Sequence, residues 1–216
     1  MKLTENTISV LKNFATINES LLINSGTQQR TMNIDRTILA EFTASDNFPI
    51  QFGIYDLPQF LANIALLENP DIEFGEKSLV MTSDMRSLSF NYCSPTHIKS
   101  PPNKTLKIDS PDVEFDLTSD NFQFLLKLAA TNNLPNVTVA NDGNQLIIKT
   151  YERSNDSSNV GTIQLGNYEG KDFSATFNVN NFKMNVNDYH VKVNLEGFAL
   201  FETKDQTLRY FIALDK

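Results

Sequence analysis

The alternation of apolar and polar positions predicts four helices separated by groups of short strands. Between positions 4 and 17, Ile8, Leu11 and Ala15 recur at i, i+3 and i+7, the spacing of one helix face. Comparable spacing behind a capping residue (Thr4, Asp56 or Ser119) predicts three of the helices. The four expected helices cover 4–17, 56–69, 119–132 and, in a shorter asparagine-rich form, 179–186.

Runs of β-prone residues between turn signals predict the strands. In the first half they are expected at 20–24, 28–33, 37–43, 47–54, 71–74, 78–82 and 87–92. In the second half they are expected at 113–117, 136–140, 145–151, 160–165, 173–178, 190–195, 199–202 and 208–214. The NDGN sequence at 141–144 predicts a tight hairpin between two of them.

The chain repeats itself. LKNFATIN at 11–18 and LKLAATNN at 126–133 share five of eight residues at an offset of 115. Asp56 and Phe60 find counterparts in Asn178 and Phe182 at an offset of 122. Such a period is too long for a solenoid unit and indicates a duplicated domain. We therefore expect a first domain over 1–93, a proline-rich linker over 94–110 and a second domain over 111–216.

This order of helices and strands predicts an α+β fold in which each domain carries two helices on one face of antiparallel sheets. The net charge is -8, yet the outward face of each clear helix carries a lysine, Lys12 or Lys127, and no acid beside it. Head-to-tail contacts that close make a ring, of two or three copies on this evidence, and could turn these faces toward one shared polyanion. The expected DNA-facing residues are Lys2, Lys12, Asn13, Gln123, Lys127, Thr131 and Lys183.

Nothing in the sequence indicates catalysis, a cofactor or a metal. The phosphate-cradling, dinucleotide-binding and nucleophile-elbow motifs are missing, and His97 and His190 stand far apart. The single Cys93 can form neither an internal disulfide nor a thiolate zinc site. No apolar run suits a signal peptide or a membrane span, so a cytosolic chain is expected. A β-rich viral structural or attachment protein is the alternative from another class, with a hydrolase third.

Several segments resemble the sliding clamps of T-even-type bacteriophages, in order and over essentially the whole chain. They are MKLTENTISVLKNFATIN at the start, IYDLPQFL at 54–61, PNK at 102–104, LGNYEG at 165–170 and YFIALD at 210–215. The resemblance implies a homotrimeric ring of six similar domains around duplex DNA, in the cytoplasm of the infected host. It also implies that the ring tethers the viral DNA polymerase, is loaded by an ATP-driven clamp loader and activates late transcription.

The layout of that family assigns two further sets of residues. The subunit interface would join the strand at 87–92 to the strand at 160–165 of the neighbour, through Leu88, Phe90, Ile163 and Leu165. Alternatively, Leu88 and Phe90 fill the core of their own domain. A pocket for partner peptides beside the linker would be formed by Tyr92, Pro95, Ile98 and Pro101.

Overall fold

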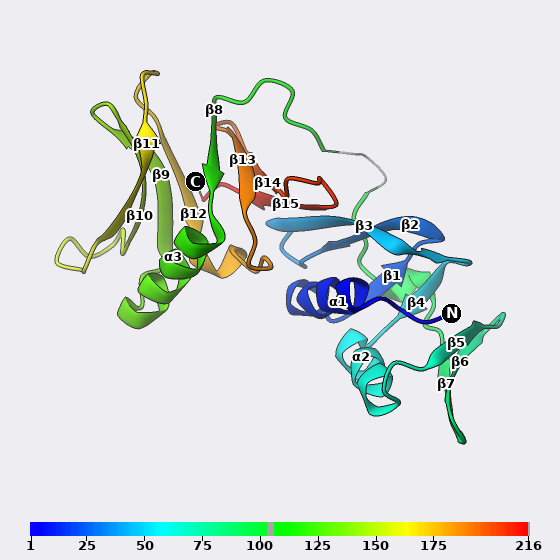
Figure 1. The fold of residues 1–216 in the computed structure, drawn as a ribbon. Helices are drawn as coiled ribbons and strands as arrows, with labels where there is room; N and C mark the ends of the chain where they lie inside the picture. The colour runs from blue at the N-terminus through cyan, green and yellow to red at the C-terminus, as the bar shows by residue number, and fades with distance from the viewer. Residues whose placement is uncertain (103–105, 216) are drawn as a thin grey trace. The chain divides into compact units, whose positions relative to one another are not determined.

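The computed structural model describes residues 1–102 and 106–215 and divides into two compact units, 1–104 and 105–216 (Figure 1). The division falls inside the stretch 94–110 that the sequence marks as linker, and residues 103–105 of that stretch lie outside the described residues. Within the described ranges, none of the helices has the length and apolar character needed to cross a membrane.

The first unit is built from two helices and seven strands, all paired antiparallel. Its elements are α1 (Glu5–Ile17), β1 (Leu21–Ile23), β2 (Gly26–Met32), β3 (Ile38–Phe48), β4 (Phe52–Ile54), α2 (Leu57–Leu66), β5 (Asp71–Phe74), β6 (Ser78–Ser83) and β7 (Arg86–Asn91). β1 pairs with β4, β2 with β3, and β5, β6 and β7 form a meander. The helices α1 and α2 lie side by side (Figure 1). A 3-10 turn, Pro95–His97, follows.

The second unit follows the same order with one strand placed before its helix. Its elements are β8 (Val113–Leu117), α3 (Ser119–Asn132), β9 (Asn136–Asp142), β10 (Gln145–Tyr151), β11 (Gly161–Asn167), β12 (Ser174–Asn178), the 3-10 turn Val179–Asn181, β13 (Tyr189–Asn194), β14 (Phe198–Glu202) and β15 (Leu208–Ala213). One antiparallel sheet has the order β11-β10-β9-β12. In the other, β8, β13, β14 and β15 are successive neighbours.

The two long helices match in register. When the chain is aligned with itself at an offset of 115, Thr7 corresponds to Phe122 and Phe14 to Ala129. All four of these side chains are buried. Thr4 caps α1 by accepting a hydrogen bond from the Thr7 amide, as expected. The cap of α3 is Thr118, not Ser119, because the Thr118 hydroxyl accepts from the Asn121 amide and Ser119 is already helical.

The prediction of a turn between two strands at 37–43 and 47–54 is wrong, because β3 runs unbroken through it. Asp46 lies in this strand with its side chain buried, between neighbours that face solvent. One of its carboxylate oxygens accepts hydrogen bonds from the Thr4 amide and the Thr4 hydroxyl, both at 2.9 Å. The acid that looks like a turn residue in the sequence therefore fixes the start of α1.

The prediction of a fourth helix at 179–186 is also wrong, so residues 106–215 of the second unit contain one α-helix instead of two. Asn178 caps only a single 3-10 turn. Phe182 and Met184 are buried beyond it at strand-like spacing. The Asn185 amide donates to the Tyr210 hydroxyl at 3.2 Å, and its carbonyl accepts from the Tyr189 hydroxyl. The Tyr210 hydroxyl thus takes an amide that the expected helix would have bonded internally, in a segment of weak helix formers.

The duplication extends one step further than the sequence indicates. β8 pairs with β13, the first strand after the 3-10 turn of the second unit. In the first unit the backbone of Met1 exchanges hydrogen bonds of 2.7 Å in both directions with Ile72 of β5, the first strand after α2. In each unit, the segment before the first helix therefore pairs with the first strand of the last group of strands. This segment is Met1 in the first unit and β8 in the second.

Phe122 allows a direct test of the buried helix face. Its side chain is fully buried and makes an edge-on contact with Tyr189 at 5.9 Å between ring centroids. We expect Phe122→Ala to lower the free energy of unfolding by about 3–5 kcal/mol, measured by denaturant titration. Val186→Ala, at a half-exposed position of the same unit, should change it by less than about 0.5 kcal/mol. Equal effects of the two substitutions would contradict the packing described.

Candidate nucleic-acid interface and free strand edges

Each of the two long helices presents one exposed lysine, Lys12 on α1 and Lys127 on α3. Neither has a carboxylate within 4 Å in the part of the chain that the structure describes. The only acid in each helix sits in its first turn, at Glu5 and Asp120, where it stabilises the helix dipole. These acids also differ by 115 positions, so the repeated unit preserves the acid as well as the base.

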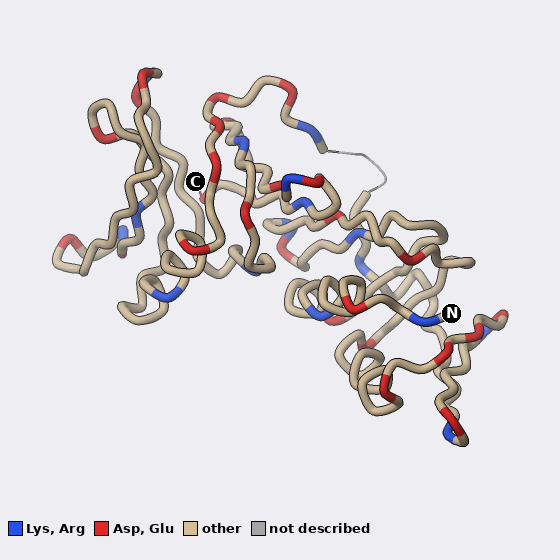
Figure 2. Tube along the Cα trace, in the orientation of Figure 1, with Lys and Arg blue, Asp and Glu red and all other residues tan. Residues whose placement is uncertain are grey.

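The separation between acid and lysine keeps the lysine charge available. Seven residues of α-helix rise about 10 Å, which is about one Debye length at physiological salt. Figure 2 shows this arrangement on α3, where the basic position lies well along the helix and the acidic one at its start.

The neutral residues expected to accompany the lysines lie on the same helices. Thr131 is exposed, whereas Asn13 and Gln123 are half-buried. The Thr16 hydroxyl donates to the Asn13 carbonyl at 2.7 Å, so the polar side of α1 is partly satisfied within the helix. Amides and hydroxyls of this kind can donate to phosphate oxygens without reading sequence.

The other two expected lysines stand in different surroundings. Lys2 precedes α1, and its ammonium lies 3.9 Å from the Asp71 carboxylate, with both groups well exposed. Such an exposed pair holds little energy, so Lys2 remains able to reach another anion. Lys183 is exposed but does not stand on a helix, because it lies between the buried Phe182 and Met184 in the segment after the 3-10 turn.

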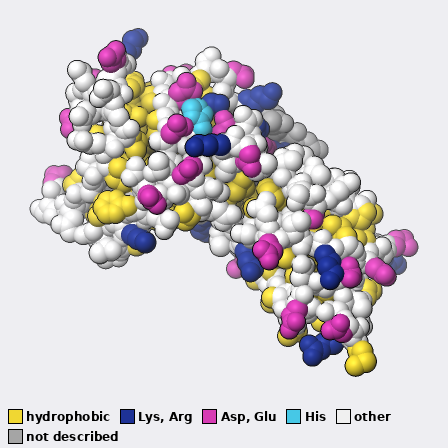
Figure 3. Space-filling model, viewed as in Figure 1, with side chains coloured by type: hydrophobic (Ala, Val, Ile, Leu, Met, Phe, Trp, Pro, Cys, Tyr) yellow, Lys and Arg dark blue, Asp and Glu magenta, His cyan; other side chains and the backbone are white. Residues whose placement is uncertain are grey.

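Acids elsewhere in the second unit are matched by bases across the strands. His190 of β13 contacts Asp116 at 2.9 Å and Glu114 at 3.6 Å, both on β8. Glu202 of β14 is buried and pairs with Lys192 at 2.8 Å and Arg209 at 3.5 Å. Figure 3 shows the histidine among acidic side chains over β8 and β13, with basic residues beside it. The acid-rich stretch 109–116 thus contributes to a solvent-facing side of the sheet, on which acidic side chains pair with basic ones.

The strands β7 and β11 each lie at the end of a sheet. Among the described residues, β7 and β11 each have a partner on one side only, β6 and β10 respectively. Leu88 and Phe90 of β7 are half-exposed, and so are Ile163 and Leu165 of β11. Leu165 lies where the β10–β11 register shifts, since Gly166 pairs with Leu146 and Gln164 with Ile147. All four residues expected at the seam therefore lie on free edges rather than deep in a core.

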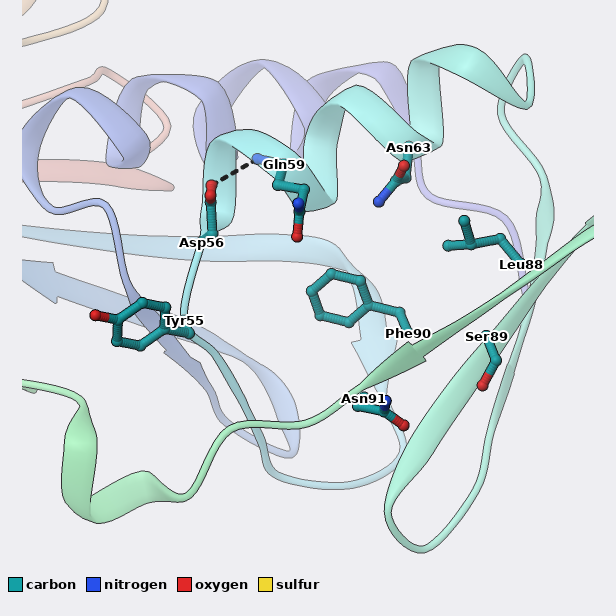
Figure 4. A pocket seen from close by; sticks show the side chains of 8 residues that line it. All are labelled: Tyr55, Asp56, Gln59, Asn63, Leu88, Ser89, Phe90 and Asn91. Atoms are coloured by element: carbon teal, nitrogen blue, oxygen red, sulfur yellow. Dashed lines mark hydrogen bonds between the residues drawn. The ribbon is translucent and has the colours of Figure 1, made fainter.

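A groove of about 470 Å³ runs between α2 and the free edge of β7. Figure 4 shows Leu88 and Phe90 pointing into it, with Gln59 and Asn63 projecting from the helix and Ser89 and Asn91 turned away. The Phe90 ring meets Phe60 of α2 edge-on at 5.2 Å. Tyr55 stands at one end with 70% of its surface exposed. No local pattern in the sequence predicts this groove, because its walls come from a helix and a strand about 30 positions apart.

The residues expected to form a peptide pocket lie in the first unit. Ile98 is buried against Gly53, where an added Cβ would lie 2.7 Å from the Ile98 Cδ1 atom and 2.4 Å from the Cys93 carbonyl oxygen. The Tyr92 ring stacks on Phe52 at 4.9 Å between centroids, and burial raises the pKa of its hydroxyl. Pro95 is exposed and Pro101 half-buried, and neither lines the groove beside α2.

With this geometry in place, comparison with known proteins is informative. The profile of the family described as DNA polymerase processivity factor matches residues 3–90. The sliding clamp of Vibrio phage KVP40 is 30% identical over 220 residues, covering 100% of this chain and 99% of that protein. The chain belongs to the sliding clamps of T4-like phages. The sliding clamp of Enterobacteria phage T4 is 26% identical over 223 residues, with 100% of this chain and 97% of that protein covered.

Solved structures of clamps share the fold at much lower identity. The proliferating cellular nuclear antigen of Entamoeba histolytica superposes with a TM-score of 0.72 at 13% identity, covering 97% of this chain and 95% of that one. The A. fulgidus PCNA, solved with the C-terminal region of FEN-1, gives 0.72 at 11% identity, covering 100% and 97%. The expected α+β clamp fold is confirmed, as is the membership in the phage clamp family.

The wall of the groove depends on the start of α2. The Asp56 carboxylate accepts a hydrogen bond from the Gln59 amide at 2.8 Å and so caps the helix (Figure 4). We expect Asp56→Ala to lower the free energy of unfolding by about 1 kcal/mol, measured by thermal or denaturant unfolding. Asp56→Asn, which keeps a capping oxygen, is the matched control and should lie much closer to the parent. A loss of similar size in both variants would point to the charge rather than the cap.

Proposed function

We propose that this clamp chain closes into a homotrimeric ring around duplex DNA and tethers the viral DNA polymerase, acting without catalysis of its own. The observation that carries the proposal is the pair Lys12 and Lys127, exposed at the same position of two repeated helices and free of carboxylate partners among the described residues. Lysine contacts to phosphate are independent of sequence, which suits a ring that must slide.

Few contacts are sufficient because the ring holds DNA by topology. Two lysines on each of three protomers amount to six phosphate contacts, with Lys2 and Lys183 as further candidates. Each neutralised phosphate steepens the salt dependence by about 0.9, which gives a slope of roughly −5 for six. Asn13, Gln123 and Thr131 would add neutral hydrogen bonds. Such contacts are individually weak, so the ring would not be arrested at any one position.

The ring seam in this proposal joins β7 of one protomer to β11 of the next. The two edges have matching alternation, with Phe90 and Ile163 half-exposed on one side and Asn91 and Thr162 exposed on the other. Antiparallel pairing of Phe90 with Ile163 would bring Asn91 opposite Thr162, so that apolar side chains meet apolar ones and polar meet polar. Because the two edges differ, the contact is head-to-tail and can close on itself.

The finer roles that follow from the resemblance belong to the same proposal. They are loading by an ATP-driven complex, activation of late viral transcription, and action in the cytoplasm of the infected host. Partner peptides would dock beside the linker, near Tyr92, Pro95 and Pro101, where Ile98 supplies the buried support rather than an exposed contact.

Topology provides the test that separates this function from its rival. A loaded ring should remain on a nicked circular duplex and be lost within minutes once the circle is cut. The measurement is co-elution of labelled protein with DNA by gel filtration before and after linearisation, with the loader and ATP present. A viral structural protein that binds DNA along its surface would stay bound to the linear form, and that result would refute the ring.

The helix lysines are tested by charge reversal. Lys12→Glu with Lys127→Glu should remove the part of the salt dependence that these six contacts supply, so that a slope of roughly −5 becomes much shallower, without impairing folding. The measurement is fluorescence anisotropy of a short labelled duplex over a series of salt concentrations. The matched control is Lys77→Glu with Lys204→Glu, two exposed lysines in turns of the two units. If the control pair changes the slope as much as the helix pair, net charge rather than the helix face explains the binding.

A further inference from the structure

The last described residues of the first unit, 98–102, are attached to that unit at both ends. We call them the linker segment. At one end, Ile98 is buried against Gly53. At the other end, the Pro102 carbonyl accepts a hydrogen bond of 2.8 Å from Nη1 of Arg30, in β2. The linker segment therefore lies along the first unit, although its proline-rich sequence is typical of a free connection.

Arg30 joins the linker segment to the sheet through two nitrogens of one guanidinium. It stands directly opposite Glu41 in the pairing of β2 with β3, and its Nη2 atom lies 2.8 Å from the Glu41 carboxylate. The two side chains expose only 17% and 11% of their surface. An ion pair so far out of water is weak evidence for stability, but it holds the planar guanidinium in one orientation. That orientation directs Nη1 at the Pro102 carbonyl.

Asn18, at the end of α1, holds the middle of the linker segment. Its side-chain amide donates to the Met32 carbonyl at 3.0 Å and to the Lys99 carbonyl at 3.2 Å. The Lys99 ammonium donates to the carbonyl of Ile34, in the turn between β2 and β3. The repeat places Asn133 at the same position of α3, where it is left-handed with a φ of 52°, whereas Asn18 is extended with a φ of -147°. The asparagine of the first unit thus contacts the linker as well as ending the helix.

We propose that Arg30 is a positioning residue for partner docking: by bridging Glu41 and the Pro102 carbonyl, it holds the linker segment in the conformation to which the DNA polymerase binds. The inference rests on the proposed docking of partners beside the linker and adds the group that prepares the site. Pro101 and Pro102 contribute stiffness, because their rings fix φ. A surface that is ordered beforehand avoids the entropic cost of being ordered during binding. Arg30 therefore raises the affinity for the partner without contacting it.

The first experiment separates the two arms of the guanidinium. Arg30→Lys keeps a positive charge beside Glu41 but has no second arm to reach Pro102, so the pair within the sheet remains and the linker segment is released. The dissociation constant between the ring and the viral DNA polymerase should rise about tenfold or more, measured by surface plasmon resonance. Polymerase binding as tight as that of the parent would overturn the inference.

Two further variants control for stability. Arg209→Lys is the matched control, because Arg209 also pairs with a buried glutamate, Glu202, but lies in the second unit. Its dissociation constant should stay within about twofold of the parent. Arg30→Leu with Glu41→Leu removes both charges together and leaves no buried charge unpaired. This double variant should fold and should lose polymerase affinity as Arg30→Lys does, and parental affinity in the folded double variant would overturn the inference.

The second experiment observes the linker segment itself. Trypsin cleaves after Lys99 when this stretch leaves the surface of the unit, so the rate of that cut reports the released population. Arg30→Lys should be cut there about tenfold faster than the parent, and Arg209→Lys at the parental rate, measured by mass spectrometry of the products. Equal rates in the parent and Arg30→Lys would overturn the inference, because Arg30 would then not hold the segment.

The residence time of loaded rings on nicked circular DNA distinguishes failure of this inference from failure of the proposed function. It should be the same in the parent and in Arg30→Lys, because Arg30 lies in β2, on neither of the long helices and on neither β7 nor β11. If the parent is retained and binds polymerase, and Arg30→Lys binds it equally well, the positioning role is wrong and the ring stands. If the parent is not retained on the circle or does not bind polymerase, the proposed function itself is wrong.

Discussion

The packing of one helix stripe onto antiparallel strands is the contact from which the rest of this chain follows. On α1 and α3 the same positions are buried, Thr7 with Phe122 and Phe14 with Ala129. Once these side chains are inside, helix geometry fixes what remains outside, so Lys12 and Lys127 must both face solvent. The basic faces are therefore a consequence of core packing, repeated when the unit was duplicated, and no separate device is needed to orient them.

Local signals in the sequence predicted the long helices, most strands and the repeat, because each depends on residues near one another. The predictions failed where a contact with a residue far away in the sequence determines the local structure. Asp46 reads as a turn residue, yet Thr4 draws its carboxylate inward and β3 continues. The segment at 179–186 reads as a helix, yet the hydroxyls of Tyr189 and Tyr210 hold Asn185 in another conformation. Neither contact can be recognised from the residues next to it in the sequence.

The same distinction between local pattern and contacts of residues far apart in the sequence applies to the candidate DNA-facing and edge residues. Lys12 and Lys127 could be named from periodicity, because exposure on a helix follows from local pattern, and the apolar residues of β7 and β11 were named from the family resemblance. The groove beside α2 could not, because it depends on how a helix and a strand far apart in the sequence lie together. The peptide pocket expected beside the linker stays a prediction, and Ile98, one of its expected residues, is buried where Gly53 leaves it room.

The single 3-10 turn Val179–Asn181, at the place where the first unit has α2, leaves the two units with different surfaces. Among the described residues the second unit has no counterpart of α2, so it cannot form a groove walled by such a helix. A molecule that recognised the groove beside α2 would therefore find one such site on each chain, although the chain is built from two copies of one unit.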